Sequence, residues 1–143
     1  ERSRLAVLRG NADGALAAAT AISQGHWRDR ARALALQIGG DRKAADAALQ
    51  RLTDAKGKGK GGAYAIARVY ALRGDADKTF EWLQRDWDGD GFAIAYFLYD
   101  PLLLRFRNDP RFAAYCQRAG LPPPSASEAL SLDEIRARVA VKS

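Results

Sequence analysis

Apolar residues recur at spacings of three and four along most of the chain, a pattern that predicts helices and not strands. The segment from His26 to Ile38 shows it most clearly, and the pair Gly39 and Gly40 ends it because glycine adopts the left-handed conformation at little cost. Strand-like alternation of any length is missing from the sequence. An all-α fold is therefore predicted. Its further helices are expected over about residues 3–9, 12–24 (ended by Gly25), 42–53 (capped by Asp41), 63–73 and 76–86.

A glycine followed five residues later by a small residue occurs three times, in the pairs Gly10 with Ala15, Gly40 with Ala45 and Gly74 with Thr79. The last two copies lie 34 residues apart (74 − 40), and the first two lie 30 apart (40 − 10). A period of this length is typical of a helix, a turn and a second helix that stack on their neighbours, because one unit cannot bury its apolar face alone. Function is then expected on a surface rather than in a catalytic pocket.

The second and third copies place an apolar residue, the turn glycine, a small residue and a leucine at matching positions: Leu36, Gly40, Ala45 and Leu49, then Tyr70, Gly74, Thr79 and Leu83. In these residues the repeat resembles the tetratricopeptide family. The resemblance implies a right-handed solenoid of antiparallel helix pairs, with short capping helices at its C-terminal end. The competing interpretation is an irregular helical bundle.

A second resemblance rests on short matches that run in order through residues 62–122: Arg68-Val69-Tyr70, Gly74-Asp75, Phe80-Glu81-Trp82-Leu83, Asp100-Pro101-Leu102-Leu103, Asp109-Pro110-Arg111-Phe112 and Gly120-Leu121-Pro122. Together they resemble the closing segment of tetratricopeptide arrays appended to bacterial regulators and signalling proteins. The resemblance implies a C-terminal, non-catalytic module whose parent chain carries its output elsewhere.

The repeat boundaries predict one helical domain over residues 1–121. Its expected parts are a half-repeat (1–25), two repeats (26–59 and 60–90) and a degenerate cap (91–121). Between these two repeats, alternating lysine and glycine from Lys56 to Gly62 predict a linker. Residues 122–143 are expected to form a proline-rich break and a tail, in which a capping box at Ser131 predicts a helix over 132–141.

Two Asp-Pro steps organise the predicted cap, because aspartate caps a helix and proline fits its first turn. They are Asp100-Pro101 and Asp109-Pro110, and each is expected to open a short helix. An earlier short helix is expected to start at Asp90 or Gly91 and to end before Pro101.

Catalytic chemistry finds little support in the sequence. The chain of 143 residues has one cysteine and one histidine, so it contains neither a disulfide nor a Cys/His metal cluster. No Gly-x-Ser-x-Gly elbow is present, and Cys116 falls in the apolar pattern of a helix, where a buried structural thiol is expected. We expect a protein that is not an enzyme and that holds no cofactor or metal.

The segment Asp86-Trp87-Asp88-Gly89-Asp90-Gly91 matches the first half of a calcium-binding loop. The bidentate glutamate that such a loop needs at its twelfth position is replaced by Phe97. We expect a turn in which Asp90 caps the next helix, and a calcium-responsive module is the weaker alternative.

Overlaying the repeats gives a candidate binding groove. The tetratricopeptide resemblance would place the first helix of each pair on the concave face, where arginines with aromatic neighbours suit carboxylates. The candidate residues are Arg4, Trp27, Arg30, Leu34, Gln37, Tyr64 and Arg68. We expect Arg30 and Arg68 to be exposed, so that replacing both would leave stability nearly unchanged. Alternatively, the arginines only solvate a helix face and Trp27 belongs to the core.

These observations predict a protein–protein interaction module that binds a peptide or a partner domain, with acidic groups favoured. The alternative is a nucleic-acid-binding helical solenoid, which the net charge of +6 and the lysine-glycine segment favour. No stretch is apolar enough to span a membrane and no signal peptide heads the chain, so a cytoplasmic location is expected, with the periplasm as the alternative. Because the chain opens part-way through a repeat, we also expect it to be a piece of a longer protein.

Overall fold

The computed structural model describes residues 2–58, 62–89, 91–122 and 137, and every regular element in these ranges is helical, which confirms the predicted all-α class there. None of the helices in these ranges has both the length and the apolar content needed to cross a membrane. The elements are α1 (Arg2–Leu8), α2 (Ala12–Thr20), α3 (Gly25–Ile38), α4 (Arg42–Gly57), α5 (Ala63–Arg73), α6 (Ala76–Asp88), the 3-10 helices η1 (Phe92–Ala95) and η2 (Phe97–Tyr99), α7 (Pro101–Leu104) and α8 (Pro110–Ala119).

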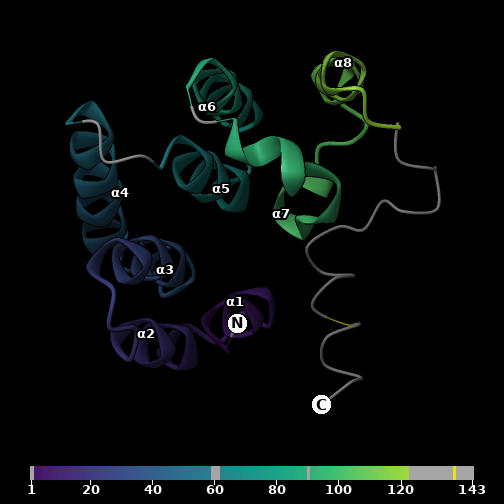
Figure 1. Cartoon of the computed structure of the whole chain (residues 1–143). Coiled ribbons are helices and arrows are strands. Elements are labelled where there is room, and N and C mark those ends of the chain that lie inside the picture. Colours follow the sequence, from purple (N-terminus) through teal and green to yellow (C-terminus); the bar gives the residue numbers. More distant parts are fainter. Residues whose placement is uncertain (1, 59–61, 90, 123–136, 138–143) are drawn as a thin grey trace.

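Each helix from α1 to α6 packs against the next one along the chain, and α3 also contacts both α1 and α5. Figure 1 shows α2, α4, α6 and α8 along the outer side of an arc, with α1, α3, α5 and α7 along its inner side. The core runs between these two rows, with α5 at its centre: Ile66, Ala67 and Val69 are fully buried there. Side chains that leave α1, α3 and α5 on the free side of the inner row therefore share one face of the molecule.

The turn glycines lie where the repeat predicts them. Gly10, Gly40 and Gly74 have φ of 72°, 79° and 80°, a left-handed conformation that residues with a Cβ rarely adopt. The small residues five positions later are all buried: Ala15, Ala45 and Thr79.

An asparagine or aspartate follows each of these glycines and caps the next helix. The side chain accepts a hydrogen bond from the amide of the residue three positions on, at 2.8 Å for Asn11 and at 3.0 Å for both Asp41 and Asp75. Asp109, 34 residues after Asp75 (109 − 75), caps α8 by accepting from Arg111 N at 2.9 Å. The 34-residue spacing thus continues through the segment that the sequence predicts as a degenerate cap.

Two predicted boundaries are wrong. The second helix ends at Thr20 and not at Gln24, and Gly25 begins α3 instead of ending α2. The Thr20 hydroxyl donates to Leu16 O at 2.9 Å, and the chain then turns away so that Ile22 lines a pocket on the inner face. The fourth helix continues to Gly57, beyond the predicted end at Thr53 and into the expected linker.

The segment from η1 to α8 follows α6, with η1 in contact with α6 and α7 in contact with α5. Both prolines lie in a first helical turn, and Asp100 Oδ1 accepts from Leu102 N at 3.1 Å. Arg105 docks this segment on α5 by donating to Ala71 O at 2.6 Å. The expected single helix after Gly91 is instead the two short 3-10 helices η1 and η2.

A buried carboxylate, Asp86, organises the segment that matches half of a calcium-binding loop. Its Oδ2 accepts from Ala93 N at 2.8 Å, so it supports η1 as a structural residue. The expected cap, Asp90, lies outside the described residues, as do residues 59–61 of the expected linker and most of the predicted helix over 132–141. Within the described ranges, no three His, Cys, Asp or Glu side chains are placed to hold a metal ion.

Cys116 is buried in α8, as its place in the apolar pattern predicts, and burial raises the pKa of its thiol. Because a buried thiol with a raised pKa forms little accessible thiolate, we expect Cys116 to react with a disulfide reagent at pH 8 only after the protein is unfolded in guanidinium chloride. Absorbance from the released chromophore measures the rate in each state. Equal rates in the folded and unfolded states would show that α8 does not cover Cys116.

Candidate functional site

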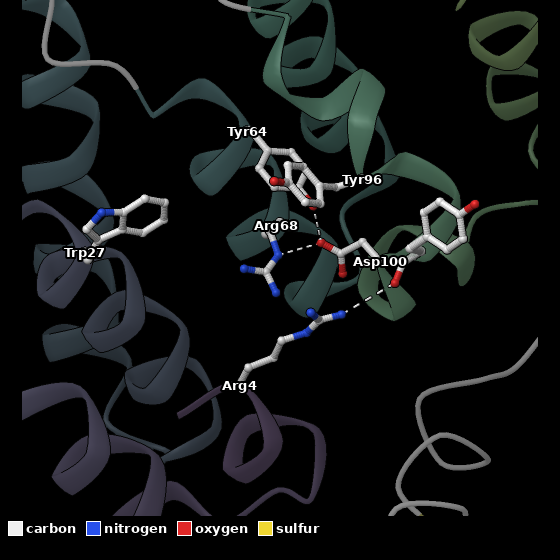
Figure 2. A pocket seen from close by; sticks show the side chains of 7 residues that line it. Arg4, Trp27, Tyr64, Arg68, Tyr96 and Asp100 are labelled. Atoms are coloured by element: carbon white, nitrogen blue, oxygen red, sulfur yellow. Dashed lines mark hydrogen bonds and ion pairs between the residues drawn. The ribbon is translucent and has the colours of Figure 1, made fainter. Parts of the chain in front are cut away.

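Two adjoining pockets lie on the inner face, where α1, α3 and α5 meet the segment from Tyr96 to Asp100 (Figure 2). Arg4, Trp27, Tyr64 and Arg68 line both of them. We call the two together the inner pocket. Its parts have volumes of about 280 and 240 Å³, with more apolar than polar lining. Each volume is slightly below the roughly 300–1,000 Å³ of sites that enclose a whole small molecule. Each part of the inner pocket therefore suits a single side chain of a partner.

Six of the seven candidate residues line this pocket: Arg4, Trp27, Arg30, Leu34, Tyr64 and Arg68. Gln37 does not. It lies about 15 Å along the α3 axis from Trp27, given ten residues at about 1.5 Å each. There its Nε2 donates to Ala33 O at 3.2 Å, and its Oε1 accepts from Arg73 Nε at 2.6 Å. Gln37 thus ties α3 to α5 outside the pocket.

Exposed aromatic side chains gather at the inner pocket. Among the described residues, the large hydrophobic side chains that stand in solvent are Trp27 (44% exposed), Tyr96 (47%) and Tyr99 (77%). All three line this pocket. Exposed apolar groups gathered in one place, rather than scattered, mark an interaction surface. The alternative in which Trp27 is a core residue is wrong.

A buried carboxylate holds the base of the pocket together. Asp100 Oδ2 accepts from the Tyr64 hydroxyl at 2.5 Å and lies 2.6 Å from Arg68 Nε (Figure 2). The N–H of Arg68 is not aimed along this contact, so the pair is ionic rather than a linear hydrogen bond. Burial, followed by the negative charge of Asp100, raises the pKa of the Tyr64 hydroxyl above its usual range. Tyr64 therefore stays protonated and serves as a donor.

The expectation that Arg68 is a freely exposed arginine is wrong. Its side chain is only 19% exposed, and that of its partner Asp100 is 4% exposed. Removing one partner of an ion pair with so little exposure destabilises the fold, because the remaining charge stays buried without compensation. Arg68 therefore lines the pocket and also stabilises the fold.

Two more arginines complete the pocket. Arg4, from α1, donates through Nη2 to Tyr99 O at 3.4 Å. The guanidinium of Arg30 lies over the Trp27 ring at 4.8 Å from its centroid, within the range of a cation–π contact. Consecutive residues, Tyr99 and Asp100, thus hold Arg4 of α1 and Arg68 of α5.

Sequence reasoning missed Tyr96, Tyr99 and Asp100. Asp100 was expected only to cap α7, which it does through Oδ1, while Oδ2 serves the pocket. The signal in the sequence was the run of Tyr96, Phe97 and Tyr99 next to an acidic residue. The 3-10 geometry of η2 decides which rings turn outward: Phe97 is fully buried, whereas the two tyrosines line the pocket.

Comparisons with protein-family models, with curated proteins and with solved structures find no match for this chain.

Proposed function

We propose that the chain is a right-handed solenoid of antiparallel helix pairs of the tetratricopeptide kind. On this proposal it acts as a non-catalytic module of a larger bacterial protein. Three features support it: the 34-residue spacing of the helix caps, the left-handed glycine at each turn, and the packing of α3 against both α1 and α5. In such an array, the inner row of helices presents the binding surface.

The proposed activity is binding of a peptide or partner domain with acidic groups in the inner pocket. One observation carries it: the exposed aromatic residues and three arginines converge on the same pocket, Arg4, Arg30 and Arg68 being the arginines. Aromatic side chains supply rigid contact area and arginines supply directed donors, and both are enriched at the energetic centres of protein interfaces.

Nucleic-acid binding, the alternative, has less support. Many basic side chains outside the pocket lie within 4 Å of a carboxylate, as in the pairs Arg73–Asp46, Arg85–Glu81, Arg111–Asp77 and Arg118–Asp88. These pairs break up the positive field that a phosphate backbone would need along its length.

Peptide selection tests the proposed function. Phage that display random dodecapeptides are selected for binding to the wild-type chain. The binding of the selected clones to Trp27→Ala is then measured. We expect enriched clones that bind the wild type and lose most of their binding to Trp27→Ala, because this exposed ring supplies contact area without supporting the core. Circular dichroism checks that the variant melts as the wild type does.

Two results would contradict this expectation. Failure to enrich any clone that depends on Trp27 would overturn peptide binding in the inner pocket. Tight binding of a single-stranded oligouridine that falls steeply with salt would favour the nucleic-acid alternative, provided that Trp27→Ala leaves it unchanged.

A further inference from the structure

The orientation of Arg68 shows where an anion would bind. Its Nε side faces Asp100, and among the described residues no hydrogen-bond acceptor meets its two Nη atoms. Figure 2 shows these two atoms directed away from Asp100, into the space between Trp27 and Arg4. Because the ion pair fixes the guanidinium, its remaining N–H groups form a fork that is already oriented for a carboxylate.

Arg4 faces the same space from the opposite side. Its guanidinium is held at one end by Tyr99 O, and Figure 2 shows it below that of Arg68. The residues that line the inner pocket include three arginines and one carboxylate, which gives a net charge of +2 (3 − 1). Like charges that face one space repel each other, and an anion bound between them would be attracted by both.

The walls beside this pair of arginines suit an aromatic ring. Trp27 stands on one side, and on the other Tyr96 stacks on Tyr64 with ring centroids 6.3 Å apart (Figure 2). The adjoining part of the inner pocket, which Trp27 and Tyr64 also line, includes the aliphatic side chains of Val7 and Leu34. A ring that enters here meets both aromatic faces and apolar side chains, which favours burial of a hydrophobic group next to the arginines.

From this arrangement we infer the chemistry of the partner: a peptide segment with an aromatic side chain and an aspartate or glutamate no more than four residues apart. The ring packs between Trp27 and Tyr96, and the carboxylate lies between Arg4 and Arg68. The inference rests on the proposed function. It adds which two side chains of the partner are recognised and which residues recognise each of them.

The clones selected on the wild-type chain test this composition. Relative to the unselected library, we expect enrichment of an aromatic residue with Asp or Glu within four positions. The strongest clone is then made as a fluorescent synthetic peptide and measured by anisotropy, together with two altered forms. One has each carboxylate changed to its amide, and the other has the ring changed to alanine.

Arg4→Ala is the decisive variant, because Arg4 is exposed and donates one long hydrogen bond, to Tyr99 O, so we expect the fold to tolerate its loss. We expect Arg4→Ala to weaken the acidic peptide about 10-fold or more, since truncating one partner of a desolvated charge pair is costly. Arg32→Ala is the matched control, because Arg32 is also exposed and does not line the inner pocket; it should leave affinity within about twofold.

The coupling between Arg4 and the carboxylate of the peptide distinguishes this inference from general electrostatic attraction. The amide peptide should bind the wild type at least as weakly as the acidic peptide binds Arg4→Ala, because it also loses the contact with Arg68. Combining the two changes should cost little more than the amide change alone. An equal loss in Arg32→Ala, or fully additive losses, would overturn the inference, as would competition for the pocket by oligouridine.

The failure of the inference and that of the proposed function can be told apart. Clones that depend on Trp27 but lack the paired ring and carboxylate would leave peptide binding in place and refute the proposed partner chemistry. An absence of clones that depend on Trp27 would refute both.

Discussion

Replacing Phe97 with alanine is expected to lower the free energy of unfolding by about 3–5 kcal/mol, because it leaves a cavity in the core. Phe97 is fully buried in η2, and its ring centroid lies 4.4 Å from that of Phe112 and 4.2 Å from that of Tyr115. Both of these partners belong to α8, so one side chain joins the two parts of the C-terminal segment. Urea unfolding followed by circular dichroism measures the loss.

Tyr99→Ala is the matched control for this variant. Tyr99 lies in the same 3-10 helix and is 77% exposed, so its removal should change stability by no more than about 0.5 kcal/mol. Its backbone carbonyl, which holds Arg4, is still present after the substitution. Equal stabilities of Phe97→Ala and Tyr99→Ala would mean that η2 does not pack on α8 as described.

The second large effect is expected at Arg68. Arg68→Ala should lower the free energy of unfolding by about 3 kcal/mol, the lower end for a buried ion pair that loses one partner, because Arg68 keeps some contact with water. Most of this loss comes from leaving the Asp100 carboxylate buried without its cation. Chemical denaturation of the variant and the wild type measures the difference.

Neutralising Asp100 tests that explanation directly. In the double variant with Arg68→Ala and Asp100→Asn, no charge is buried, and the asparagine oxygen can still accept from Leu102 N. We expect the double variant to be more stable than Arg68→Ala alone. A double variant that is less stable would show that lost packing of the arginine, and not the uncompensated charge, explains the effect.

This coupling between site and fold decides which variants report on binding. Loss of binding in Arg68→Ala would mix a lost contact with a weakened fold, because the same guanidinium serves both. Arg4 and Trp27 are both exposed and contribute less to the core. Variants at these residues therefore separate a lost binding contact from a loss of stability. The arginines of a groove are not equivalent, even where the repeats place them at equivalent positions.

Local chemistry made most of the helix boundaries predictable. Gly40 and Gly74 stop a helix because only glycine takes the left-handed turn easily, and the aspartate after each starts the next one through its side chain. The predicted helix over residues 63–73 ends at the same residue as α5 for this reason. The prediction failed at Gly25, where no such pair of signals exists.

The candidate site was predictable as a set of positions but not as a geometry. Helical spacing places Trp27, Arg30 and Leu34 on one stripe, and the repeat relates Arg4 to Arg68, so the sequence determines that these residues share the inner face. Only the tertiary structure decided that Asp100 would reach Arg68 and Tyr64, each more than 30 residues away. Contacts of this kind depend on how η2 and α7 dock against α5. That docking depends on long-range packing, about which the local sequence pattern carries no information.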